Sequence, residues 1–109
     1  MSGREIEASV LVSAAIKLKQ CQNNWNARER RKKLDEALKY NKLIWTIFQS
    51  ELVKPENTVP KKLRESLLNL SVFIHKHTFH MMCYPSPDKL SILIHINLSI
   101  AAGLRKKPK

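Results

Sequence analysis

The sequence feature that most constrains the fold is an apolar seam within residues 34–52. Read in alternating steps of four and three, this seam consists of Leu34, Leu38, Asn41, Trp45, Phe48 and Leu52. Such spacing places side chains on one face of a long α-helix. A second row lies beside the first and contains Ala37, Tyr40, Ile44 and Ile47. A helix with so wide an apolar face is expected to lie centrally, with neighbours on more than one side.

Asn41 is the polar exception in this seam, and two interpretations of it remain open. It is either a core amide satisfied by neighbouring backbone, or an amide at the edge of a groove that water reaches. Asn97 interrupts a comparable row formed by Leu90, Ile94, Ala101 and Leu104. We favour the groove interpretation for Asn41, and favour it less for Asn97.

Four segments show helical apolar spacing, and we expect helices at about residues 3–23, 27–53, 59–83 and 87–102. Connections of a few residues imply antiparallel neighbours. The fold class is therefore predicted to be all-α, as a single domain of four antiparallel helices that resembles a four-helix bundle. The basic tail at residues 105–109 is expected to be disordered.

Local signals set the expected helix ends. Asn26 with Glu29 fits a capping box, Thr58 fits a cap before Pro60, and Ser86-Pro87-Asp88 is typical of a helix start. Gly103 is placed to end the last helix in the left-handed conformation. In the third segment the predicted buried row consists of Leu63, Leu67, Leu70, Ile74, His77 and Met81, flanked by Leu68, Phe73 and Phe79.

Composition limits the setting in which the chain works. At 109 residues it can bury a core without disulfides. Its two cysteines, Cys21 and Cys83, are far apart, which favours a reducing compartment. No run approaches the ~20 apolar residues needed to cross a bilayer, and no export signal is evident. We therefore expect a cytoplasmic protein without membrane insertion.

No catalytic constellation is evident in the sequence. His77 and His80 lie one helical turn apart, but a metal site needs three or four ligands with oriented supporting groups. There is no glycine-rich phosphate loop and no nucleophile turn. We therefore expect a protein that is not an enzyme and has no cofactor and no metal site.

The net charge of +11 is concentrated partly in one basic cluster, Arg28, Arg30, Arg31, Lys32 and Lys33. Cations at a helix N-terminus oppose the macrodipole, at a cost of a few tenths of a kcal/mol each, so helix propensity does not explain the cluster. It is either a solvated face or a binding patch. Counterion release would give nucleic acid a salt-dependent affinity, but no aromatic residues interleave to form a stacking platform.

Several segments in order resemble one known family. The stretch Leu34-Asp35-Glu36-Ala37-Leu38, followed by Tyr40-Asn41 and Trp45-Thr46-Ile47-Phe48, closely resembles the core motif of the FlaF family of flagellar biosynthesis regulators. Leu70–Ile74, Pro85–Leu90 and Ile96–Leu104 are similar to its later segments. The resemblance as a whole extends over roughly residues 5–104.

The resemblance implies a small, cytoplasmic, non-enzymatic, all-α protein. Members of the family bind flagellin and support its synthesis and secretion as a chaperone or assembly factor, and they are functionally linked to FlbT, a regulator of flagellin mRNA. A disordered, apolar-patterned flagellin end could fold as an amphipathic helix into a groove of the bundle. The residues that we expect to contact this partner are Tyr40, Asn41, Ile44, Trp45, Ile47 and Asn97. The row of Tyr40, Ile44 and Ile47 could instead simply pack against another helix.

An alternative function belongs to a different class. The basic cluster at residues 28–33 could bind RNA, so that the protein regulates translation of flagellin mRNA. The protein could also act only as an adaptor that contacts another regulator.

Overall fold

The computed structural model describes residues 3–106, which form four α-helices, one short 3-10 helix and no strand. The elements are α1 (Gly3–Asn23), α2 (Arg30–Leu52), α3 (Lys61–Cys83), η1 (Pro87–Lys89) and α4 (Leu90–Arg105). The predicted all-α class is therefore confirmed. None of the helices between residues 3 and 106 has the combination of length and apolarity that a membrane span requires.

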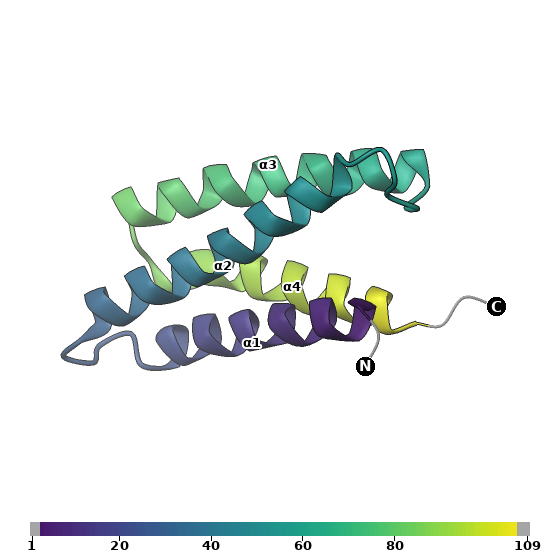
Figure 1. Ribbon diagram of the computed structural model, residues 1–109. Coiled ribbons are helices and arrows are strands. Elements are labelled where there is room, and N and C mark those ends of the chain that lie inside the picture. Colours follow the sequence, from purple (N-terminus) through teal and green to yellow (C-terminus); the bar gives the residue numbers. More distant parts are fainter. Residues whose placement is uncertain (1–2, 107–109) are drawn as a thin grey trace.

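Helix α2 lies between α3 and the pair formed by α1 and α4. Helix α1 packs most extensively against α4 and next against α2, whereas α3 packs mainly against α2. Figure 1 shows α3 diverging from the α1 and α4 pair, away from the short connection that links α3 to α4. The bundle is consequently open on one side, and the helix that carries the apolar seam is central, as predicted.

The core follows the predicted seam closely in α2. All six seam residues are buried, and Trp45 at its centre is fully buried. Small residues let α1 and α4 approach each other, since Ala8, Ala14 and Ala101 have no exposed surface. A buried tryptophan such as Trp45 typically contributes about 3–5 kcal/mol to stability.

Helix α3 buries a narrower face than the sequence predicts. Its buried residues are Leu67, Ser71, Ile74, Thr78 and Met81, and two of them are small and polar. Ser71 faces α2, because its Oγ donates to Gln49 Oε1 at 3.0 Å. Leu63 is 51% exposed, so its predicted burial was wrong, and Phe79, which was expected to flank the buried row, is 69% exposed. The physical reason is that α3 has one substantial helical neighbour, which leaves its flanking apolar residues uncovered.

The expected starts of α2 and α3 were placed too early. Residues 24–29 form turns, in which Ala27 N–H donates to Asn24 C=O, and α2 begins at Arg30 with no side-chain cap. Near α3, the Asn57 side chain accepts a hydrogen bond from Val59 N–H at 2.9 Å. This local bond competes with the helix, and α3 begins at Lys61.

The ends of the last helix also differ from expectation. Ser86 does not cap a helix through its side chain. Pro87–Lys89 form the 3-10 helix η1, and α4 follows directly. Gly103 is not left-handed, and α4 continues to Arg105, whose guanidinium donates to Ser9 Oγ at 3.3 Å. Contact with α1 thus extends the helix. Of the predicted tail, residues 107–109 lie outside the described residues.

Candidate functional site

A buried hydrogen-bond network joins three helices at the centre of the molecule. Trp45 Nε1 donates to Asn97 Oδ1 at 3.0 Å, and Asn97 Nδ2 donates to Asn41 Oδ1 at 2.6 Å and to Leu11 C=O at 3.3 Å. The three side chains are fully buried. This network, termed the amide network below, connects α1, α2 and α4 and satisfies most of the polar atoms that the apolar seams enclose.

The groove interpretation of Asn41 and Asn97 is therefore wrong. Both are core amides, but Asn41 is bonded by the Asn97 side chain and not by neighbouring backbone, as the core interpretation had expected. Each amide faces the other because α4 packs its own polar interruption opposite that of α2. Asn41 Nδ2 has no hydrogen-bond partner among the described residues. Asn41, Trp45 and Asn97, which we expected to contact a partner, lie where no partner reaches them in this arrangement of helices.

Tyr40 packs against α1 and lines neither of the two hollows described below. Its ring is half-buried, and Lys17 Nζ of α1 lies 5.2 Å from the ring centroid. This cation–π arrangement covers one face of the ring. Tyr40 thus supports the contact between α1 and α2, which matches the packing alternative for this member of the row.

Ile44 and Ile47, by contrast, line an apolar groove of about 810 Å³ where the start of α3 and the start of α1 meet the end of α2. We call it the open-end groove. Three of its apolar side chains, Ile6, Ile47 and Leu63, are exposed at 51%, 55% and 51%. Its other apolar residues are Val10, Leu11, Ile44, Phe48, Leu52, Val59, Leu67 and Leu104.

Two carboxylates lie within this groove. Glu51 pairs with Lys54, whose Nζ lies 2.8 Å from its carboxylate oxygen. Glu7 is half-buried and makes no ion pair within the described residues. Burial raises the pKa of Glu7, an effect that Arg4 opposes and Glu51 reinforces. The groove therefore holds a partly desolvated acid that makes no ion pair in the described part of the chain and whose burial the nearby Arg4 offsets only in part.

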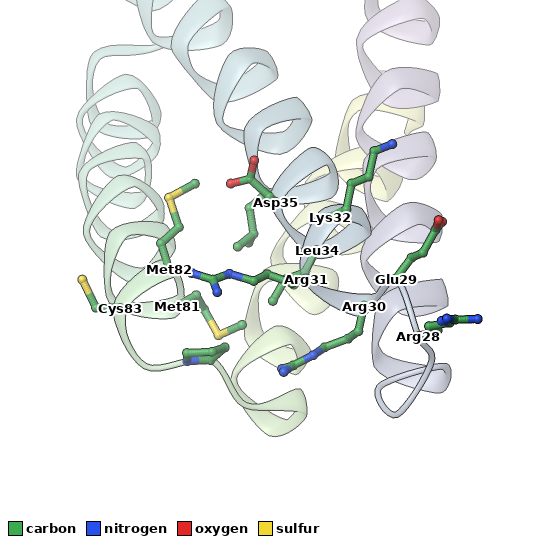
Figure 2. Close-up of a pocket in the computed structure, with 12 residues that line it drawn as sticks. Arg28, Glu29, Arg30, Arg31, Lys32, Leu34, Asp35, Met81, Met82 and Cys83 are labelled. Carbon is green, nitrogen blue, oxygen red and sulfur yellow. The ribbon is translucent and has the colours of Figure 1, made fainter.

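The basic cluster lines a second hollow, of about 830 Å³, at the opposite end of α2. Figure 2 shows this basic pocket between the start of α2 and the end of α3. Its lining residues include Arg28, Arg30, Arg31 and Lys32, together with Met81, Met82, Cys83 and Pro85. Lys33 is not among them. Arg30 is partly engaged, because its guanidinium lies 4.6 Å from the Trp25 ring centroid.

His77, one of the histidines considered as metal ligands, makes structural contacts instead. His77 Nε2 lies 2.7 Å from Lys89 C=O, and its ring stacks on Phe73 with centroids 5.4 Å apart. Among residues 3–106 no group of three His, Cys, Asp or Glu side chains gathers in a way that could hold a metal ion.

Sequence reasoning missed the contribution of α1 and α3 to the groove. Leu63 was predicted to be buried because it continues a helical apolar row, and Ile6 was not assigned to a groove. Their exposure depends on how far α3 diverges, which no periodicity reports. The acid Glu7 carried a weak signal, since it interrupts the apolar residues of the α1 start.

Comparison with known proteins gives one match. The family model described as "Flagellar protein FlaF" matches residues 1–104. No curated protein and no solved structure matches the chain. The matched range takes in all four helices through Leu104 and includes the apolar seam, the amide network and both hollows. The chain therefore belongs to the FlaF family of flagellar proteins.

Proposed function

We propose that this protein binds flagellin before assembly and supports its synthesis and secretion, as a cytoplasmic chaperone that is not an enzyme. Membership of a flagellar family supports a role in this process. The observation that carries the proposal is the open-end groove, where exposed apolar side chains from the starts of α1 and α3 and from α2 face a common hollow. A functional link to the regulator FlbT belongs to the same proposal.

The groove suits an amphipathic helix. Helix α3 has one substantial neighbour, and a helix placed in the groove would supply a second while it covers Ile6, Ile47 and Leu63. Burying one such side chain contributes about 1.5–3 kcal/mol. Part of that gain is used to order the incoming segment, so binding is reversible, as delivery to an export apparatus requires.

Glu7 gives the groove a charge preference. A half-buried carboxylate whose burial Arg4 offsets only in part is stabilised further when a partner brings a second positive charge to it. We therefore infer that the bound helix presents a lysine or arginine beside its apolar stripe. A partner helix with an acid at that position would meet Glu7 and Glu51 and be repelled.

The experiment compares two variants with purified flagellin monomer in gel filtration and calorimetry. Ile47→Glu places a charge in the groove, whereas Ile16→Glu places one on α1 outside it; the two isoleucines are 55% and 53% exposed. We expect Ile47→Glu to weaken flagellin binding at least about tenfold, equivalent to ~1.4 kcal/mol. Ile16→Glu should bind like the unchanged protein.

Two results would overturn this proposal. If the unchanged protein and flagellin migrate separately at concentrations of tens of micromolar, the partner is wrong. If both variants bind as well as the unchanged protein, flagellin is the partner but the groove is not its site.

A further inference from the structure

We propose that the basic pocket is a second docking site, which takes an acidic peptide segment whose carboxylates flank an aliphatic side chain. It lies at the other end of α2 from the open-end groove, so this proposal does not depend on the flagellin proposal. Three observations support it: uncompensated cations, an adjoining methionine wall, and the lack of a free aromatic surface.

The cations of the pocket have no acidic partners in the fold. Within residues 3–106, the ion pairs are Lys39 with Asp35 and Lys54 with Glu51, and neither uses a cation of the pocket. Of the two acids in the lining, Asp35 is thus engaged by Lys39 at 2.9 Å, while Glu29 makes no ion pair with these cations.

Three cations of the pocket, Arg30, Arg31 and Lys32, also weaken the helix that carries them. Helix α2 starts with four consecutive basic residues, has no acid in its first turn and has no side-chain cap. This arrangement opposes the helix macrodipole. Local choices that conflict with the fold and bring no compensating contact are expected at functional sites. Glu29 at the N-cap position is the acid nearest this helix start, and an incoming carboxylate would add negative charge beside it.

The opposite wall of the pocket is apolar. Figure 2 shows Arg31 reaching from α2 toward Met82 of α3, while Lys32 and Arg28 point away from Met82. Met82 is 41% exposed, and Met81 lies buried beneath the same wall. Methionine adapts its shape to varied apolar groups. A carboxylate can therefore bind the Arg31 guanidinium through two parallel hydrogen bonds while a neighbouring aliphatic side chain contacts Met82.

This combination favours a peptide over a nucleic acid. Phosphates would also pair with arginine, but single-stranded bases gain affinity by stacking on aromatic rings. The lining of the pocket contains no aromatic residue. The nearby Trp25 ring is already covered on one face by Arg30. Bases would therefore meet methionine and leucine side chains without a stacking surface.

The test uses a synthetic peptide in which glutamates flank leucines, with a matched peptide that carries glutamine at each glutamate. Arg31→Glu is compared with Lys62→Glu. Both positions are exposed and each is the second residue of its helix, α2 or α3, so net charge and helix-end effects are matched. We expect the acidic peptide to bind, the glutamine peptide to bind at least about tenfold more weakly, and Arg31→Glu to lose about tenfold in affinity where Lys62→Glu loses little.

A second readout places the peptide without any variant. Cys83 is exposed in the lining of the pocket, whereas Cys21 is buried in the core. Bound acidic peptide should slow alkylation of Cys83 in the unchanged protein, and the glutamine peptide should not.

Three results would each overturn the proposal. Equal weakening by Arg31→Glu and Lys62→Glu would mean attraction by net charge alone. Alkylation of Cys83 at the same rate with saturating peptide would place the peptide elsewhere. Tighter binding of single-stranded oligouridylate than of the acidic peptide, removed by Arg31→Glu, would assign the pocket to RNA.

Discussion

The two ends of α2 carry hollows of similar size and opposite chemistry. The open-end groove, of about 810 Å³, has apolar walls and two carboxylates. The basic pocket, of about 830 Å³, has four cationic residues in its lining, of which Arg31 reaches toward a methionine wall. Both exist because α3 adjoins α2 without strong contact to α1 or α4, which leaves both ends of the α2–α3 contact open.

The two ends of α2 can differ in chemistry because the structure of the helix is fixed in its middle. Between them lies the amide network, in which Asn97 holds Trp45, Asn41 and the backbone of Leu11. The middle of α2 is therefore fixed by directional bonds, while its ends are free to differ in chemistry. Changes in the middle should affect both ends alike, whereas changes at one end should leave the other intact.

The largest effect is expected for Asn97→Leu. The variant removes the acceptor of Trp45 Nε1 and the donor to Asn41 Oδ1, and it leaves both buried. Each unsatisfied buried group costs about 1–3 kcal/mol, so we expect a loss of about 3 kcal/mol in the free energy of unfolding, measured in urea. Binding at both ends should weaken together as the unfolded fraction grows.

Asn41→Leu is the matched comparison for this prediction. Asn41 contributes one acceptor, its Nδ2 has no partner, and Asn97 Nδ2 keeps its bond to Leu11 C=O. We therefore expect a loss of only about 1 kcal/mol. A larger loss of stability for Asn41→Leu than for Asn97→Leu would mean that Asn41, and not Asn97, is the central residue of the amide network.

The sequence predicted the middle of the molecule better than its ends, for a physical reason. The seam of α2 is buried on more than one side, so its residues keep a regular apolar spacing of four and three that the sequence shows clearly. The partner of Asn41 lies 56 positions away, and the period of one helix says nothing of what faces it. Leu63 continues an apolar row of α3 but is exposed, because its burial depends on the neighbours that α3 lacks.

The candidate sites were predictable only in part, for the same reason. Ile44 and Ile47 were expected at a groove, and they line one. Asn41, Trp45 and Asn97 were expected there too, but they are core. The basic cluster was evident as consecutive basic residues in the sequence. The methionine wall of the basic pocket comes from α3 and could not be inferred from those residues.

The next effect tests whether the two ends are independent. We expect Ile47→Glu to lose at least about tenfold in flagellin affinity with unchanged affinity for the acidic peptide. Arg31→Glu should show the reverse pattern. Calorimetric titration of both variants with both ligands measures all four values. Loss of both affinities in either variant would show that the ends are coupled through α2.

A smaller effect concerns the stability of the basic end. Arg31→Glu replaces a cation by an anion in the first turn of α2, where the macrodipole favours negative charge. We expect the free protein to gain about 0.5 kcal/mol in unfolding free energy at low salt. Lys62→Glu in the first turn of α3 should gain a similar amount. A net loss for Arg31→Glu would indicate that its side chain supports the fold through its contact with the α3 wall.

The smallest effect is expected for Glu7→Gln in the open-end groove. Burial raises the pKa of Glu7, so the folded protein holds this proton to a higher pH than the unfolded chain does. The ionised carboxylate therefore lowers stability above the folded pKa, and this cost fades as pH falls toward the usual range of glutamate. Glu7→Gln should unfold at a slightly higher temperature at neutral pH, and the difference should shrink in acid.

The same variant should bind flagellin more weakly, because it cannot attract the cation that we infer on the partner helix. Glu65→Gln, at an exposed position of α3, is the control and should change neither property. A gain in stability with unchanged flagellin affinity would show that Glu7 affects the stability of the free protein and takes no part in binding. A loss of stability at neutral pH would instead mean that the attraction of Arg4 outweighs burial, and the groove would then have no unmet need for a partner's charge.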